Sequence, residues 1–136
     1  MHRILPLTSA IALAVLAQPA AAEAEEEIEA VITGQLDAFN DGDIEEAWDY
    51  ASPGIQAIFG SPGNFGVMVE DGYPMVWQNQ GARMMDQREI GGALWQEVWV
   101  SDAGGRVHAL AYKMIELDGA WKIDAVMMLP PPDLGV

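Results

Sequence analysis

The sequence predicts an α+β domain in which N-terminal helices pack on a curved antiparallel sheet of four or five strands. As far as about Gly72, apolar residues recur with the spacing of amphipathic helices. After Tyr73-Pro74 they alternate with a period of two, which is typical of strands. Asp118-Gly119 adds a two-residue hairpin signal to this second half. Helices followed by hairpin-connected strands indicate a layered α+β fold.

Residues 1–22 have the three parts of a secretory signal peptide. A short basic start precedes an apolar run over residues 4–17, and Ala20-Ala21-Ala22 supplies small residues for cleavage. The apolar run is too short to span a membrane comfortably. We therefore predict cleavage near Ala22 and a periplasmic or secreted protein. The mature chain would consist of one domain over residues 23–129 and a proline-rich tail over residues 130–136.

The chain is strongly acidic and contains no cysteine. Its 136 residues carry a formal net charge of −15, and residues 23–82 contain 13 acidic residues without one Lys or Arg. This charge argues against nucleic acid and anionic membranes as partners, because both are polyanions. Without cysteine the domain depends on packing instead of disulfides, and thiolate zinc sites are excluded. The acidic surface either keeps the protein soluble or binds a basic partner protein.

Four helices are predicted in the first half, and capping residues mark where they begin. The first covers residues 25–40 and has glutamates in its first turn. Asp43 and Glu46 form a capping box for the second helix. Ser52-Pro53 and Ser61-Pro62 begin the third and the fourth, and a glycine ends each of them.

Five strands are predicted from the alternation of apolar residues. They cover residues 75–78, 82–90, 94–101, 106–117 and 120–129. If Asp118-Gly119 is the turn, Lys113 faces Asp124 as a cross-strand ion pair. If residues 102–105 form the preceding turn, Trp99 lies opposite His108. Trp95 then lies opposite Tyr112, and Glu97 lies between the two tryptophans on the same face.

Both faces of this predicted sheet are apolar. The helices can cover only one of them, so the other face needs a second cover. We predict a homodimer through that second face.

The run Ala51-Ser52-Pro53-Gly54-Ile55-Gln56-Ala57-Ile58-Phe59-Gly60 resembles a family of short exported bacterial proteins classed as a domain of unknown function. Phe65, Met68-Val69, Gly72-Tyr73-Pro74 and residues 118–123 match the same pattern, which extends over residues 28–129. The helical first half, with its break at residues 40–43, is also similar to the nuclear transport factor 2-like (SnoaL-like) superfamily. That resemblance implies a cystatin-like cone or roll. Where the family pattern has Gly-Cys in the last strand, this chain has Asp124-Ala125. The family implies a fold and no established activity.

Glu97 and His108 are the candidate catalytic residues. On the predicted register they are diagonal neighbours among aromatic side chains, where a carboxylate has a raised pKa and serves as a general base. Alternatively, Glu97 lies at the rim of the cone and His108 only packs. An open cavity above ~300 Å³ inside the cone with Glu97 in it would favour the catalytic interpretation, whereas a cone filled by its own aromatic residues would not.

Aromatic residues provide a second kind of candidate site. Tyr73, Trp77, Trp95, Trp99 and Tyr112 are the candidate ligand-binding residues, because together they could line a dry pocket. Aromatic residues on a sheet face also form ordinary cores, and the sequence leaves both interpretations open.

No metal site and no cofactor are predicted. The acidic residues 37–49 lack the spacing of a calcium loop, and the chain has no phosphate loop and no nucleophile elbow. We therefore expect an exported, non-enzymatic binding or accessory domain whose partner is a small apolar ligand or a protein. One alternative is a small pocket enzyme of the isomerase or dehydratase type that uses Glu97 and His108. The other is an acidic protein-interaction domain.

Overall fold

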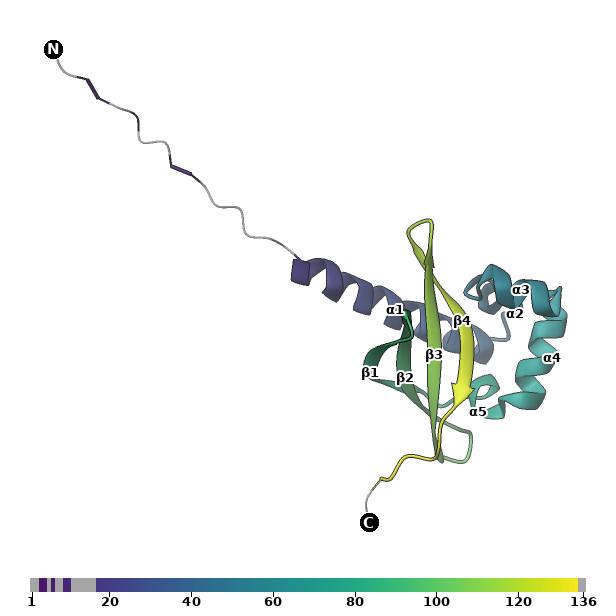
Figure 1. The fold of residues 1–136 in the computed structure, drawn as a ribbon. Helices are drawn as coiled ribbons and strands as arrows, with labels where there is room; N and C mark the ends of the chain where they lie inside the picture. The colour runs from purple at the N-terminus through teal and green to yellow at the C-terminus, as the bar shows by residue number, and fades with distance from the viewer. Residues whose placement is uncertain (1–2, 5, 7–8, 11–16, 135–136) are drawn as a thin grey trace.

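The structure, a computed structural model, describes residues 3–4, 6, 9–10 and 17–134. Half of the predicted signal peptide, 11 of its 22 residues, lies outside these residues. Five helices precede four strands in the described part: α1 (Ala17–Asn40), α2 (Ile44–Asp49), α3 (Pro53–Phe59), α4 (Pro62–Gly72), α5 (Pro74–Trp77), β1 (Ala82–Ile90), β2 (Ala93–Ser101), β3 (Val107–Leu117) and β4 (Ala120–Met128). The strands form one antiparallel sheet in the order β1-β2-β3-β4. The predicted α+β class is confirmed (Figure 1).

The helices α2, α3 and α4 begin where the capping residues predicted, whereas α1 begins at Ala17, ahead of the predicted start at residue 25. Asp43 accepts a hydrogen bond from the backbone N–H of Glu46 at the start of α2. Ser52 and Ser61 cap α3 and α4 in the same way, each followed by a proline in the first turn. α3 ends at Gly60, whose φ of 80° is the left-handed conformation that glycine adopts without strain.

One predicted strand is wrong. Residues 75–78 were expected to extend the sheet, but Pro74–Trp77 is the short helix α5. Pro74 occupies its first turn, where proline has the φ angle that a helix needs and no N–H is lost. Met75 and Val76 are both buried. In a run of only four residues, the pattern of apolar positions does not distinguish a helix from a strand.

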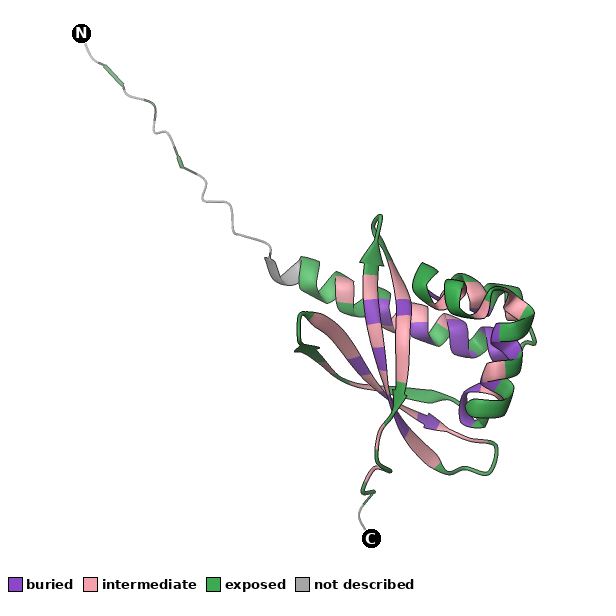
Figure 2. Cartoon of the chain, turned by 45° about the vertical axis from the view of Figure 1, so that its right-hand side comes forward, coloured by how far each residue is buried: buried purple, intermediate pink, exposed green. Residues whose placement is uncertain are grey.

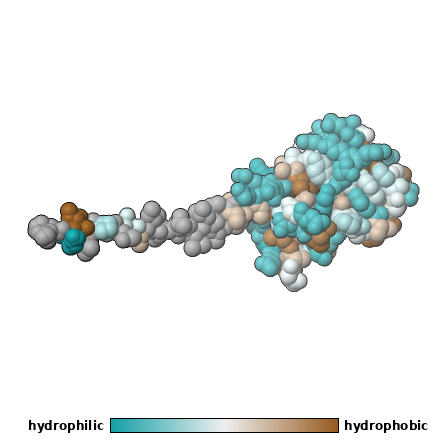
Figure 3. Space-filling model, turned by 90° about the horizontal axis from the view of Figure 1, so that it is seen from above, coloured by the Kyte–Doolittle hydropathy of each residue, from teal (hydrophilic) through white to brown (hydrophobic). Residues whose placement is uncertain are grey.

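The core lies between α1 and one face of the sheet, which we call the inner face. Ile28, Ile32 and Leu36 of α1 are buried at helical spacing, and alternate residues of β2 are buried against them. Figure 2 shows the buried residues on α1 and along the middle of the strands. Seen from the end where β3 turns into β4, the surface of the domain is mainly hydrophilic with smaller hydrophobic patches (Figure 3).

The hairpin between β3 and β4 has the predicted turn. Leu117 pairs with Ala120, and the φ angles of Asp118 and Gly119 are +52° and +82°. Two successive positive φ angles are those of a type I′ turn, which matches the twist of the strands.

The predicted register between β2 and β3 is wrong by one residue. Ser101 pairs with Val107, so Trp99 lies opposite Ala109 and His108 lies opposite Val100. The cause is the turn, which is one residue longer than predicted: Asp102 donates its backbone N–H to the carbonyl of Arg106. A shift of one residue moves every side chain of a strand to the other face.

The predicted ion pair between Lys113 and Asp124 is confirmed at 3.7 Å, although the two residues are not direct partners. Lys113 pairs with Ala125, and the next residue of β3 pairs with Ile123. Asp124 is therefore the extra residue of a β-bulge. The bulge also changes the pairing of Met127, which lies opposite Ala111 and is 53% exposed.

The face of the sheet turned away from the helices, the outer face, carries partly exposed tryptophans. Trp95 and Trp99 are half-buried there, and Ile90 at the end of β1 is exposed. The homodimer through this face stays a prediction. Light scattering of the purified chain at micromolar concentrations tests it, because a mass of one chain would contradict it.

Among the residues that the structure describes, none of the helices combines the length and the hydropathy that a membrane span requires.

Candidate functional site

The inner face of the sheet and the helices enclose a cavity of about 260 Å³. Its wall is almost entirely apolar and comes from α1, α3, α4, α5, β3 and β4. The lining residues are Gln35, Phe39, Ala51, Ile55, Ile58, Phe59, Phe65, Met68, Val69, Tyr73, Val76, Tyr112, Ile123, Ala125 and Val126. Ile58 of α3 is 72% exposed, whereas Phe39 and Phe65 are buried, so the cavity opens to solvent beside α3.

The segment between α2 and α3 is attached to the edge of the sheet, and this attachment holds the α3 wall. Ala51 forms a parallel bridge with Ile123 of β4. The Ser52 N–H donates to the Ile123 carbonyl at 2.8 Å, and the Ser52 hydroxyl donates to Asp124 at 2.7 Å. The same hydroxyl accepts the N–H of Ile55 as the cap of α3. The bulge at Asp124 therefore supplies the carboxylate that fixes this wall.

Replacing Ser52 by alanine is expected to lower the free energy of unfolding by about 2 kcal/mol, because both a helix cap and a hydrogen bond to a carboxylate are lost. Ser61→Ala is the matched control. Among the described residues, the Ser61 hydroxyl accepts only the capping hydrogen bond from the Asn64 N–H, and its loss is expected to lower the free energy of unfolding by about 1 kcal/mol. Denaturant unfolding measures both variants. If they lower the free energy of unfolding equally, the hydrogen bond between Ser52 and Asp124 does not have the stabilising role proposed for it.

Aromatic side chains gather on the helical side of the cavity. Phe65 lies at the centre of this aromatic cluster, with ring centroids 5.9 Å from Phe39, 5.9 Å from Phe59 and 5.6 Å from Trp48. Trp77 packs on Phe39 at 5.8 Å. The rings are tilted or edge-on, the arrangement that aromatic pairs prefer in cores. The cluster gives the cavity a rigid apolar wall.

Three side chains bring hydrogen-bonding groups to the wall, and two of these groups have partners. The Gln35 amide donates to the Ala47 carbonyl at 3.1 Å, and the Tyr73 hydroxyl donates to the Val126 carbonyl at 3.3 Å. Tyr112 is 1% exposed, and its hydroxyl has no hydrogen-bond partner among the described residues. Burial, with the nearby Tyr73 hydroxyl as a smaller cause, raises the pKa of Tyr112 far above its usual value, so this hydroxyl stays neutral. A buried polar group without a partner is uncommon and calls for an explanation.

The five predicted ligand-binding residues do not form one site. Tyr73 and Tyr112 line the interior cavity. Trp77 lines a separate surface hollow beside Gly66 and Glu70. Trp95 and Trp99 lie on the outer face of the sheet, where the shifted register places them.

The two candidate catalytic residues are separated by the sheet. Glu97 lies opposite Ala111 on the outer face, and it accepts a hydrogen bond from the indole N–H of Trp99 at 2.9 Å. It lines an outer groove of about 330 Å³ with Trp95 and Arg88. His108 lies opposite Val100, whose side chain is buried on the inner face. A substrate cannot contact both side chains, because the sheet lies between them.

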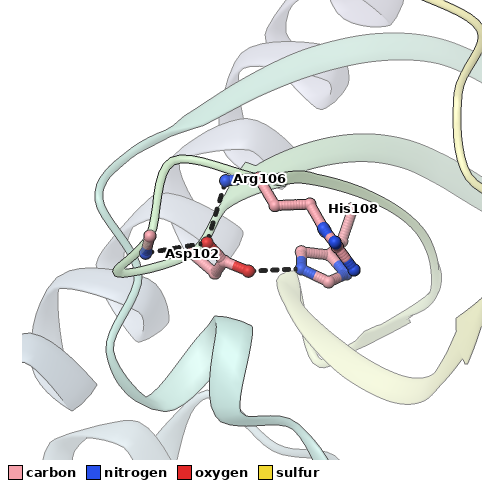
Figure 4. Close-up of polar contacts among 4 residues, drawn as sticks. Asp102, Arg106 and His108 are labelled. Carbon is pink, nitrogen blue, oxygen red and sulfur yellow. Dashed lines mark hydrogen bonds and ion pairs between the residues drawn. The ribbon is translucent and has the colours of Figure 1, made fainter.

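His108 takes part in the turn that joins β2 and β3. Its ring nitrogen Nε2 lies 2.8 Å from Asp102 Oδ2, while Asp102 Oδ1 accepts the backbone N–H groups of Gly104 and Arg106 (Figure 4). The hydrogen bond from His108, and then those from the Arg106 and Gly104 backbone, hold the pKa of Asp102 below its usual value. This carboxylate organises the turn that sets the register of the sheet.

The contribution of Asp102 to stability is expected to depend on pH. A carboxylate with a lowered pKa stabilises the fold above the ordinary aspartate pKa of 3.8, and this contribution is lost as the pH falls through its folded value. The difference in unfolding free energy between the wild type and Asp102→Asn should therefore shrink as the pH falls below 3.8. Asp118→Asn, at the exposed hairpin tip, is the control and should differ little from the wild type at any pH. If the difference in unfolding free energy between the wild type and Asp102→Asn does not change with pH, the lowered pKa assigned to Asp102 is wrong.

Sequence reasoning placed several cavity residues in the core without recognising that they surround a common space. Phe39, Phe59, Phe65 and Met68 lie on the apolar stripes of three helices, and this is the signal that marks them. Gln35 carries no such signal, since it is a polar residue within a helix. In the described part of the chain, no three His, Cys, Asp or Glu side chains come together as a metal-binding group.

Comparison with known proteins gives one match. A family model described as a domain of unknown function (DUF4864) matches residues 21–136. No similar curated protein and no similar solved structure was found.

Proposed function

Because the chain belongs to the DUF4864 family, whose description assigns no activity, we propose from its geometry that it is a binding domain for a small apolar molecule. The ligand occupies the interior cavity, and the protein binds it without chemical conversion. The observation that carries this proposal is the buried Tyr112 hydroxyl, which has no hydrogen-bond partner among the described residues and lies in a wall that is almost entirely apolar. Ligand pockets are typically apolar with a small number of polar groups that orient the ligand.

The size of the cavity limits the ligand. An engineered apolar cavity of about 150 Å³ is enough to bind benzene. A cavity of about 260 Å³ accordingly accepts one ring with a short substituent, on the order of ten non-hydrogen atoms. The exposed side chain of Ile58 marks the entrance beside α3.

Blocking the cavity tests this function. Val126 lies opposite Tyr112 and lines the interior cavity, Val107 lines a hollow beside Trp99 on the outer face, and both valines are half-buried. Val126→Phe should weaken the binding of acetophenone, a ligand of this size, at least tenfold, because the added atoms occupy the ligand's space. Val107→Phe adds the same atoms on the other side of the sheet and should leave binding unchanged. Ligand-observed NMR measures both affinities, and the reverse pattern would move the site to the outer face.

The enzyme alternative loses its support from the separation of Glu97 and His108, and we do not propose it. The acidic protein-interaction domain stays a prediction. Binding of a basic partner by the acidic helices would weaken steeply with salt, whereas binding in an apolar cavity would not.

Membership of the nuclear transport factor 2-like superfamily is part of the proposal. The arrangement of helices over a curved antiparallel meander supports it, and so does a cavity between the two layers.

Export is also part of the proposal and rests on the sequence of residues 1–22. The first buried side chain of α1 whose burial is described is Ile28, so cleavage after Ala22 would leave the packing of this helix intact. N-terminal sequencing of the protein from the periplasmic fraction should begin at Glu23. Recovery of the uncleaved chain from the cytoplasm would contradict export.

A further inference from the structure

The chemical class of the ligand follows from the charges and hydrogen bonds around the cavity. Among the described residues, no Asp, Glu, His, Lys or Arg side chain lines the cavity. The Lys and Arg residues of the described domain lie elsewhere: Lys113 pairs with Asp124, Lys122 donates to the Asp49 carbonyl, Arg83 and Arg88 are on β1, and Arg106 is in the turn before β3.

An anionic ligand would therefore be buried without a counter-charge. Moving a carboxylate from water into apolar surroundings is strongly unfavourable unless it is paired. The net charge of −15 adds long-range repulsion of anions. A cationic ligand faces the same loss of hydration, because no carboxylate lines the wall. The cavity therefore selects uncharged molecules.

The Tyr112 hydroxyl is the polar group of the cavity wall that is buried without any hydrogen-bond partner among the described residues. The Gln35 amide and the Tyr73 hydroxyl each already donate to a backbone carbonyl. A ligand with an oxygen acceptor satisfies the hydrogen of the Tyr112 hydroxyl. A ligand that only donates would leave it unpaired, and an unpaired buried donor is costly.

Building on the proposed function, we infer that the ligand is a neutral, mostly apolar molecule with one oxygen acceptor, such as a ketone, aldehyde or ester, which accepts a hydrogen bond from Tyr112. Fatty acids and other carboxylates are excluded from the cavity.

Three probes of the same shape test this class: acetophenone, α-methylstyrene and benzoate. Each is a phenyl ring on a trigonal carbon, and they differ in having one carbonyl oxygen, no oxygen, or a carboxylate that is ionised at pH 7. Acetophenone should bind the full chain at least tenfold more tightly than benzoate. Tyr112→Phe should weaken acetophenone about tenfold and should leave α-methylstyrene unchanged or more tightly bound. Tyr73→Phe is the matched control in the same wall, and it should affect the two neutral probes alike.

The outcomes separate this inference from the proposed function. If benzoate binds within tenfold of acetophenone, or if Tyr112→Phe weakens both neutral probes equally, the inferred ligand class is wrong while the cavity remains a binding site. If none of the three probes binds, or if Val126→Phe weakens none of them, the proposed function is wrong. Tyr112→Phe is expected to fold, because it removes only an oxygen that has no partner, and its unfolding midpoint should equal or exceed that of the wild type.

Discussion

Replacement of Asn79 by alanine is expected to lower the free energy of unfolding by about 3 kcal/mol. Asn79 is buried between the end of α1, α5 and the start of β1. Its amide donates to the carbonyls of Leu36 and Val76, and its Oδ1 accepts from Asn40 at 3.1 Å and from the Gly81 N–H at 3.3 Å. Alanine removes all four bonds and leaves buried carbonyls with fewer partners. For a domain with a stability of about 5–15 kcal/mol, this is a large loss.

Asn64→Ala is the control for this prediction. The Asn64 amide makes one exposed hydrogen bond, to the Phe59 carbonyl at 3.0 Å, so about 0.5 kcal/mol is expected. Denaturant unfolding followed by tryptophan fluorescence measures both variants. If Asn79→Ala lowers the free energy of unfolding no more than Asn64→Ala does, the buried hydrogen bonds of Asn79 do not join the helices to the sheet.

Replacement of Leu110 by alanine should lower the free energy of unfolding by a similar amount, about 3 kcal/mol. Leu110 is fully buried on the inner face of β3, where it lies opposite Val98. Three carbon atoms are lost from a packed position, and the resulting void adds to the loss of buried apolar area.

Leu117→Ala makes the same change at the other end of the strand. Leu117 is 36% exposed beside the hairpin turn, so a loss below about 1 kcal/mol is expected. If Leu110→Ala and Leu117→Ala lower the free energy of unfolding equally, the inner face of β3 is not the centre of the core.

The sequence could predict the segments of this fold because their boundaries depend on neighbouring residues. Serine or aspartate caps begin α2, α3 and α4, and Gly60 ends α3. The Asp118-Gly119 turn is determined by two adjacent residues with positive φ. The Met75–Gln78 segment was predicted wrongly because four residues are too few to separate a period of two from one of 3.6.

The candidate site was predicted only in part, and the reason is the register of the sheet. The five-residue turn closed by Asp102 and Arg106 carries Trp95, Glu97 and Trp99 to the outer face and keeps Tyr112 on the inner face. A turn of four residues was equally consistent with the glycines in the sequence. The hydrogen bonds of one carboxylate, Asp102, decide between the two lengths.

The amino-acid sequence by itself determined the fold class, the order of the elements, most of their boundaries and the acidic character of the domain. Each of these depends on composition, on local periodicity or on a few adjacent residues. The tertiary structure alone decided which side chains share a cavity. That outcome depends on one extra residue in the β2–β3 turn and on the bulge at Asp124. In a sheet, where side chains alternate between faces, a change of one residue places a group on the opposite side.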